Sequence, residues 1–226
     1  RLTNLLSGTR AISWPDSNSA YAYLSFFFRG EYNYKELYYA EVAARTDASS
    51  RFGKDHRWGM FWSLGFMWNI KNEAFLKDIE WLTNAQIKLS TGTSGNSEIP
   101  YYDHLALVAG DANYNDEAGI YPKQSGNEEL SWEQTWANNI GLTLGIFNRV
   151  NLNVDFYHKK TTNMLMLVPQ SYAITGVGNR WDNIGAMMNR GVEIAMDGDV
   201  IRTKDFTWNL SANVSYNKNK LLELYN

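Results

Sequence analysis

Residues 58–70, WGMFWSLGFMWNI, alternate in character along the whole stretch. The even positions, from Trp58 to Ile70, are all bulky and apolar, whereas the odd positions, from Gly59 to Asn69, are mostly small. Successive side chains of a β-strand point to opposite faces. This stretch therefore predicts a strand with one large apolar face.

Seven further stretches alternate in the same way. They span residues 20–34, 37–46, 82–91, 132–146, 150–159, 191–200 and 207–217. The chain is therefore predicted to be all-β, with about eight long antiparallel strands.

The charged residues inside these stretches avoid the apolar stripe. The charges are Arg29, Glu31, Glu41, Arg45, Lys88, Glu133, Asp155, Lys159, Glu193, Asp197 and Asp199. Every one lies on the opposite face. A basic side chain facing lipid at the bilayer midplane costs about 2–4 kcal/mol, so a stripe free of charge indicates contact with hydrocarbon. We expect the wall of a transmembrane β-barrel.

Two other all-β architectures also fit an alternating pattern: a soluble β-sandwich, for example a carbohydrate-binding domain, and a complete small outer-membrane barrel. Strands of globular proteins centre near about 5 or 6 residues, and these stretches are longer. Aromatic residues near the stripe ends also suit the interfacial belts of a barrel. They are Tyr32, Tyr34, Trp58, Trp68, Trp132, Trp208 and Tyr216.

The connections alternate between short and long. The short joins are residues 35–36, 71–81, 147–149 and 201–206, and residues 72–77 suit one helical turn. The longer polar segments are residues 47–57, 92–131, 160–190 and the tail from 218. Outer-membrane barrels have short periplasmic turns and long extracellular loops, so both ends of this strand set would lie outside. The pattern favours an open arc of a wider barrel over residues 20–226, after an extracellular segment at 1–19.

Composition excludes several classes of protein. The 226 residues contain no cysteine, which excludes disulfide scaffolds and thiolate zinc sites. The net charge of −3 argues against a nucleic-acid partner, because phosphate binding requires a clustered basic surface. Aromatic residues make up 15% of the chain, which excludes intrinsic disorder.

The sequence gives little indication of a metal-binding or catalytic site. His56 and His104 are predicted to be solvated loop residues, and His158 to lie at a membrane interface; none has metal-ligand spacing. Residues 111–117 alternate oxygen ligands as calcium loops do, but Asp116 and Pro122 stand where glycine and glutamate are expected. No nucleophile, base and orienting group can be assembled, so we expect no enzyme, no metal and no cofactor.

Aromatic residues in the long segments are the candidate substrate contacts, since they can stack on sugar rings or peptide side chains. They can equally pack against one another or against a partner. The candidates are Tyr101, Tyr102, Tyr114, Tyr121, Tyr172 and Trp181. The glycine-rich residues 175–179 do not join a strand to a helix in a phosphate-binding arrangement and suit a mobile loop.

Short motifs occur in a fixed order from residue 32 onward. They are RTDASSRFG (45–53), RWGMF (57–61), GTSGN (92–96), LSWE (130–133), NIG (139–141), DFYHKKTT (155–162), NIGAMMNRGVE (183–193) and YNKNK (216–220). In this order they resemble the SusC/RagA family of TonB-dependent outer-membrane transporters. Trp62 departs from the proline that the family often has there.

The resemblance implies uptake of oligosaccharides or peptides across the outer membrane, energised by the TonB complex. It also implies a SusD-like surface lipoprotein as a lid and contact with outer-membrane lipid. Such barrels have about 22 strands, so eight strands would form about a third of the wall. The family's plug domain and its TonB-contacting segment have no counterpart in this sequence.

Overall fold

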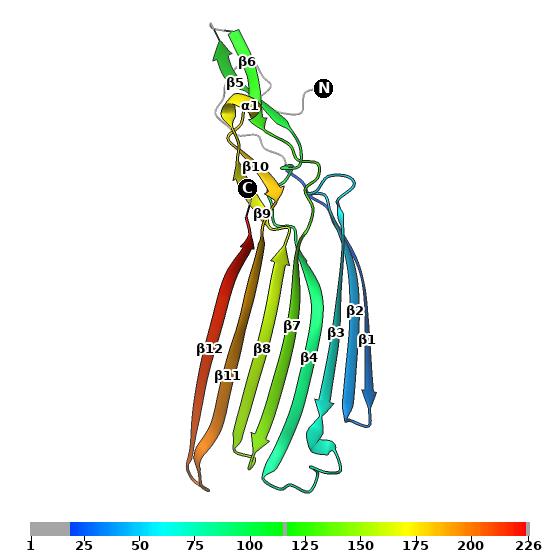
Figure 1. Cartoon of the computed structure of the whole chain (residues 1–226), viewed down its shortest axis with the longest axis vertical. Coiled ribbons are helices and arrows are strands. Elements are labelled where there is room, and N and C mark those ends of the chain that lie inside the picture. Colours follow the sequence, from blue (N-terminus) through cyan, green and yellow to red (C-terminus); the bar gives the residue numbers. More distant parts are fainter. Residues whose placement is uncertain (1–18, 115–116, 225–226) are drawn as a thin grey trace.

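Eight long strands form one open antiparallel sheet (Figure 1). The computed structural model describes residues 19–114 and 117–224, without the side chains of 111–114 and 118. In spatial order the strands are β1 (Tyr23–Tyr34), β2 (Tyr38–Ser49), β3 (Trp58–Asn69), β4 (Leu82–Asn96), β7 (Glu133–Ile146), β8 (Val150–Thr162), β11 (Ala186–Arg202) and β12 (Thr207–Glu223). All eight predicted strands are confirmed. The predicted segment 1–19 lies outside the described residues except for Ser19.

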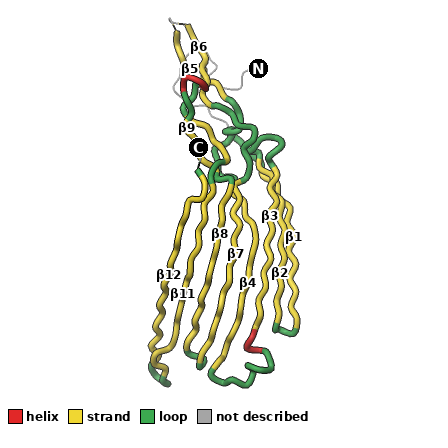
Figure 2. Tube along the Cα trace, in the orientation of Figure 1, coloured by secondary structure: helices red, strands yellow, loops and turns green. Residues whose placement is uncertain are grey.

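Tight turns join the strands at one end of the sheet, as predicted (Figure 2). Lys35 and Glu36 both have positive φ, and Leu37 N–H donates to the Tyr34 carbonyl at 3.0 Å. Positive φ at both central residues is the signature of the type I′ turn, whose twist matches that of the strands. The longer join contains a 3₁₀ helix, η2 (Ile70–Asn72), which begins two residues before the predicted helical turn.

The opposite end carries structure that the sequence patterns did not predict. A hairpin of β5 (Leu107–Tyr114) and β6 (Glu117–Gln124) rises from one long segment. A second hairpin pairs β9 (Leu165–Pro169) with β10 (Asn179–Asn183), around the short helix α1 (Tyr172–Thr175). None of the helices in the described part of the chain has the length and apolarity to cross a bilayer.

The strand register assigns the two faces of the sheet. One cross-strand row is apolar from edge to edge: Tyr32, Ala40, Phe66, Leu89, Ile140, Phe156, Val192 and Tyr216. The adjacent row on the other face is Glu31, Glu41, Gly65, Ser90, Asn139, Tyr157, Gly191 and Asn217. Residues directly opposite in a sheet share a face. We call these the apolar face and the polar face, and all eleven predicted charges lie on the polar face.

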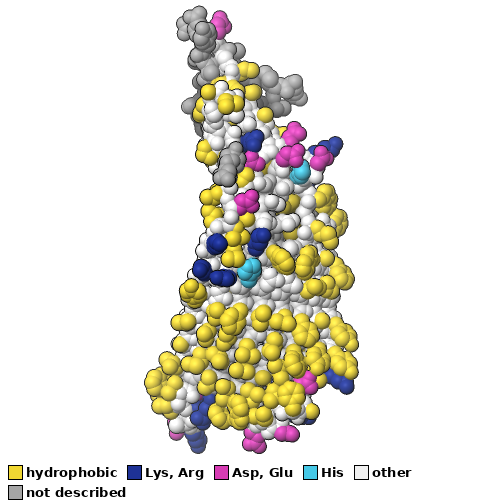
Figure 3. Space-filling view, in the orientation of Figure 1, with side chains coloured by type: hydrophobic (Ala, Val, Ile, Leu, Met, Phe, Trp, Pro, Cys, Tyr) yellow, Lys and Arg dark blue, Asp and Glu magenta, His cyan; other side chains and the backbone are white. Residues whose placement is uncertain are grey.

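The apolar face remains uncovered in the described part of the molecule. Figure 3 shows a broad hydrophobic band over the lower half of the sheet, flanked by charged groups. Phe66 is 40% exposed, Phe156 51% and Val214 67%. The other two sheets are the two-stranded hairpins beyond its upper end. A β-sandwich would bury this face beneath a second sheet, so that alternative is wrong.

The hydrophobic band drifts along the strands from β1 to β12. On β1 the upper edge of the band lies at Leu24, eight residues above Tyr32, whereas on β12 the upper edge lies at Tyr216. The register connects Tyr32 to Tyr216 through seven strand-to-strand steps. Eight residues rise about 26 Å and seven steps span about 34 Å, so the band is inclined by roughly 38° to the cross-strand rows. Barrel strands tilt by about 35–45°, and the band is therefore level with a membrane.

Aromatic rings flank this band at both ends. Near the turns, Tyr38 stacks between Phe66 and Trp68, and Glu73 accepts hydrogen bonds from Tyr38 Oη at 2.7 Å and Trp68 Nε1 at 3.0 Å. Tyrosine and tryptophan suit an interface because an apolar ring carries a polar tip. Trp132 was wrongly predicted to belong to such a belt. It precedes β7 and lies buried, 5% exposed, because it turns into a cluster above the sheet.

The two faces predict opposite responses to an introduced charge. In the full-length protein, Leu64→Arg and Phe26→Arg should block membrane assembly, since each lipid-facing arginine costs about 2–4 kcal/mol. Ser63→Arg and Ser25→Arg, one residue away on the polar face, should assemble and narrow the pore. Heat-modifiable migration on gels measures assembly, and equal tolerance at all four positions would contradict the assignment of faces.

Candidate functional site

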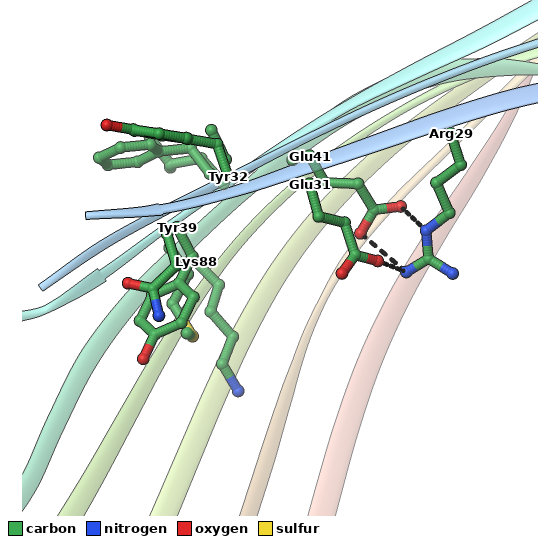
Figure 4. A pocket seen from close by; sticks show the side chains of 12 residues that line it. Arg29, Glu31, Tyr32, Tyr39, Glu41 and Lys88 are labelled. Carbon is green, nitrogen blue, oxygen red and sulfur yellow. Dashed lines mark hydrogen bonds and ion pairs between the residues drawn. The ribbon is translucent and has the colours of Figure 1, made fainter. Parts of the chain in front are cut away.

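The polar face carries a hollow of about 700 Å³ across β1 to β4 (Figure 4). Figure 4 shows Arg29, Glu31, Tyr39, Glu41 and Lys88 on one side of the sheet, with Tyr32 on the other side. Strand alternation explains this placement, because the five residues occupy polar-face positions of β1, β2 and β4. The hollow is lined by charges of both signs beside aromatic surface.

Arg29 joins the two acids of this hollow. Its Nη2 lies 2.6 Å from Glu31 Oε1, and its Nε lies 3.1 Å from Glu41 Oε1. All three side chains are more than 40% exposed, so each pair contributes only about 0–1 kcal/mol to stability. Lys88 has no ion-pair partner among the described residues. These charges are therefore accessible to solvent on this face.

Amide and hydroxyl groups continue the polar face across the other strands. Asn139 Nδ2 donates to Ser90 Oγ at 3.1 Å, and Thr143 Oγ1 donates to Asn153 Oδ1 at 2.9 Å. A second hollow of about 490 Å³ includes Asp155, Lys159 and Glu193 on β8 and β11. The polar face thus presents hydrogen-bonding groups from one edge of the sheet to the other.

Toward the end that carries the hairpins, Arg45 and Asp47 form a close ion pair on the polar face. Arg45 Nε lies 2.7 Å from Asp47 Oδ1 and 2.8 Å from Oδ2, and its Nη2 donates to Ser25 Oγ at 3.2 Å. Asp47 is only 4% exposed. A buried carboxylate requires a partner to offset its desolvation, and Arg45 supplies that partner from the same strand, while its hydrogen bond to Ser25 connects β2 to β1.

Above this pair lies the main hydrophobic core, which we call the rim cluster. Its buried members are Phe52, Phe61, Ile99, Leu130 and Trp132, with Leu165 and Trp181 packed against them. Phe61 extends across Gly59 and Gly95, where a Cβ atom would overlap its ring. The rim cluster unites several of the sequence motifs, which lie far apart along the chain.

Asn183 fastens the second hairpin to the rim cluster. Its Oδ1 accepts from Ser131 N–H at 2.7 Å, and its Nδ2 donates to the carbonyls of Ser131 and Asn163 at 2.8 and 3.0 Å. Only an amide supplies both an acceptor and two donors in this arrangement. The sequence patterns identified the motif that contains Asn183 but not this role.

The structure separates the six candidate substrate aromatics. Tyr101 stacks on Tyr21 at 5.1 Å, with the Arg51 guanidinium 5.1 Å from the Tyr101 ring centre. The Tyr102 hydroxyl donates to the Ala20 carbonyl at 3.0 Å and accepts from Ala20 N–H at 2.9 Å. Both tyrosines therefore make contacts that hold Ala20 and Tyr21 against the loop.

The other four candidates lie in the hairpins. Trp181 packs on the rim cluster from β10. Tyr172, at the start of α1, is 72% exposed, and Tyr121 on β6 is 43% exposed. Tyr114 ends β5, and its side chain lies outside the described residues. The structure does not bring the five described rings together into one site.

The histidines and the acidic loop differ in part from expectation. His104 was wrongly predicted to be solvated: it is 8% exposed because the loop folds over it. Next to it, burial raises the pKa of the Asp103 carboxyl, opposed by the charge of His104 and a hydrogen bond from Trp181. His56 Nε2 lies 3.1 Å from Glu129 Oε2.

The side chains of 111–116 lie outside the described residues, and the described part contains no group of three metal-ligating side chains.

Substitution of Asn183 tests whether the rim cluster holds the hairpin. Asn183→Leu in the full-length protein should loosen the β9–β10 hairpin by about 1 kcal/mol, because it leaves the partly buried N–H and carbonyl of Ser131 without their partner. Limited proteolysis within residues 163–183 should then accelerate. Asn179→Leu, at an exposed position of the same hairpin, is the control, and equal proteolysis of the two variants would contradict this role.

Comparison with known proteins gives consistent matches over nearly the whole chain. The family described as TonB dependent receptor-like, beta-barrel matches residues 2–224. The chain is 37% identical over 207 residues to TonB-dependent receptor P39 of Formosa agariphila, covering 91% of the chain and 20% of that protein. It is 36% identical over 213 residues to TonB-dependent receptor SusC of Bacteroides thetaiotaomicron, covering 89% of the chain and 21% of that protein.

Solved structures agree with the sequence comparison. The RagAB peptide importer in its closed-closed state superposes with a TM-score of 0.88 and 39% identity, over 99% of this chain and 25% of that chain. The siderophore receptor PirA from Pseudomonas aeruginosa shares the fold, with a TM-score of 0.61 and 14% identity over 89% of this chain and 35% of that chain. The chain spans about a fifth of the length of the curated relatives it matches. It belongs to the TonB-dependent receptor β-barrel family of the outer membrane, as a barrel segment of the SusC/RagA type.

Proposed function

We propose that this chain forms part of the barrel wall of an outer-membrane importer energised through TonB. The observation that carries the proposal is the polar face, which runs without interruption across eight strands and is backed by a level hydrophobic band. A wall with this pattern separates a wet lumen from lipid. The parent protein would take in oligosaccharides or peptides through that lumen.

The edges of the sheet support a larger barrel around this segment. In the described sheet, β1 and β12 each pair on one side only. An unpaired backbone group in hydrocarbon costs several kcal/mol, so further strands must continue from both edges. We propose that about a third of a 22-stranded wall is formed here.

Relatives support the choice of cargo and partner. One similar structure is that of the RagAB peptide importer, and another relative is TonB-dependent receptor SusC. Charges of both signs at Arg29, Glu31, Glu41 and Lys88 suit peptides with charged ends and side chains. The amide-rich remainder of the polar face suits oligosaccharides, which remain the second candidate. By likeness to these relatives, a SusD-like lipoprotein would cover the outer end.

The outer hairpins are the proposed contact region for that lid and for the cargo. Tyr121 and Tyr172 are the most exposed of the candidate aromatics whose side chains are described, so they are the best placed to stack on a solute. Residues 1–19 would add an extracellular segment at the same end. The relatives are named as receptors and importers, and the family gives no indication of enzymatic activity.

A pair of lumen substitutions tests the import function. Gly65 and Ser90 are cross-strand neighbours on the polar face, and a Cβ atom at Gly65 would meet only Glu41 at 3.6 Å. The double variant Gly65→Trp/Ser90→Trp therefore adds two bulky rings to the lumen; it removes the side-chain hydrogen bond between Asn139 and Ser90 and leaves the backbone ladder of the sheet in place. In a strain that depends on the parent protein, uptake of labelled oligopeptides or maltooligosaccharides should fall several-fold.

Leu64→Trp provides the matched control, because the new ring faces lipid. It should leave uptake unchanged at equal surface abundance, and a protonophore should abolish uptake by the unmodified protein. Unimpaired uptake by the double variant, or uptake that persists without the proton gradient, would contradict an energised importer with this lumen wall.

A further inference from the structure

A cluster of cations lies on the apolar face, although all eleven charged residues within the predicted strands lie on the polar face. β8, β11 and β12 extend beyond the predicted strand ends, and their added residues continue the alternation. The register aligns His158, Arg190 and Lys218 in one row, and Lys160, Met188 and Lys220 in the next row on the same face. Figure 3 shows the Lys and Arg side chains gathered with a histidine above the hydrophobic band.

These cations lack acidic partners. None of the ion pairs in the described part of the chain includes Lys160, Arg190, Lys218 or Lys220, and all four side chains are exposed. Among the neighbouring positions on the same face, Gln134, Trp136, Asn138 and Met188 are uncharged. Glu223 follows in the next row, where a β-bulge pairs it with Ala186, and it takes part in none of the ion pairs in the described part of the chain. Adjacent strands lie about 4.8 Å apart and alternate residues about 7 Å apart. Four positive charges thus share a surface about 10 Å wide, with His158 as a further hydrogen-bonding group.

The cluster lies directly above the end of the hydrophobic band. The row below it is Ile140, Phe156, Val192 and Tyr216, which closes the band on these strands. A groove of about 400 Å³ crosses this boundary, with those four side chains below and His158 and Arg190 above. The cationic residues lie near the end of β8, the start of β11 and the end of β12. These strand ends are on the side of the hairpins, opposite the short turns (Figure 1). The cations therefore occupy the headgroup level of the outer leaflet.

We propose that this surface binds a phosphate-bearing lipid of the outer leaflet. An acyl chain would lie against the apolar part of the groove, and the phosphate would meet Arg190, Lys218 and the adjacent lysines. Arginine is suited to phosphate because its guanidinium donates two parallel hydrogen bonds. The cations complement the negative charge of a phosphate, and the hydrocarbon-facing side chains lie directly next to them along the strands. Both features favour a lipid over a soluble anion. This proposal rests on the outer-membrane location and not on the import function.

Lipid binding by the purified full-length protein in detergent tests this site. Native mass spectrometry would compare diphosphoryl lipid A with lipid A from which both phosphates have been removed. Near an anionic surface each cation contributes about 1 kcal/mol, roughly a fivefold change in affinity. The double variant Arg190→Gln/Lys218→Gln should bind diphosphoryl lipid A about 25-fold more weakly and the dephosphorylated lipid as before.

The control removes the same charge from the other face. Lys88→Gln/Lys159→Gln lies on the polar face and should bind both lipids like the unmodified protein. Folding of each variant is checked by heat-modifiable gel migration. Salt provides a second measurement on the unmodified protein: raising it from about 0.05 to 0.5 M should weaken binding of the phosphorylated lipid alone.

Four results would overturn the proposal: equal binding of the two lipids by the unmodified protein, equal loss of binding in the control, displacement of the lipid by millimolar inorganic phosphate, or retained binding of diphosphoryl lipid A by the Arg190→Gln/Lys218→Gln variant. Displacement by phosphate would assign the cations to a soluble anion. Retained lipid binding by the Arg190→Gln/Lys218→Gln variant, with loss of association between copies or with the lipoprotein, would assign them to a protein interface and would also overturn it.

Discussion

Every backbone amide and carbonyl that faces hydrocarbon must be hydrogen-bonded within the protein, and the rest of this structure depends on that constraint. Water cannot satisfy these groups inside a bilayer, so the chain crosses as a continuous ladder of antiparallel strands. Once the ladder is fixed, strand alternation assigns each side chain to lipid or to water. The apolar row from Tyr32 to Tyr216 and the polar row from Glu31 to Asn217 are two consequences of the same ladder.

The drift of the hydrophobic band links this local rule to the barrel. A band that ran parallel to the cross-strand rows would require strands perpendicular to the membrane plane. The band instead shifts from Leu24 on β1 to Tyr216 on β12 at its upper end, as tilted barrel strands require. The same tilt explains why one cross-strand row on the apolar face contains both Leu64 on β3 and Arg190 on β11. Leu64 still faces hydrocarbon, whereas Arg190 has already reached the level of the headgroups.

Sequence patterns predicted the membrane-embedded part of the fold well and the outer part poorly. Between the two interfaces, contact with lipid forces an alternation that is visible in the residues, so all eight strands were found. Beyond the interface both faces of a strand meet water, and the alternation of polarity disappears. For this reason the sequence pattern predicts loops at the ends of β8, β11 and β12, and it does not predict the β5–β6 and β9–β10 hairpins.

The functional surfaces follow the same division. The polar wall residues were placed correctly because each follows from strand parity. The outer loops could not be assembled from sequence, since their packing depends on contacts between distant segments. Trp132 illustrates this, because it continues the parity of the apolar stripe and yet turns inward to pack on Phe52 and Phe61. Tyr101 and Tyr102 likewise make internal contacts that no local pattern indicates.

Site-directed spin labelling along β3 tests the central claim most directly. These 226 residues contain no cysteine, and single cysteines would be placed at each position from Trp62 to Asn69, below the buried Gly59 and Phe61, in the full-length protein within a bilayer, with any cysteine elsewhere in that protein replaced. Collision with oxygen, which concentrates in lipid, should peak at even positions, and collision with a water-soluble nickel chelate should peak at odd positions. Profiles that rise and fall together, or that peak at the reverse positions, would contradict the account of a lipid-facing wall.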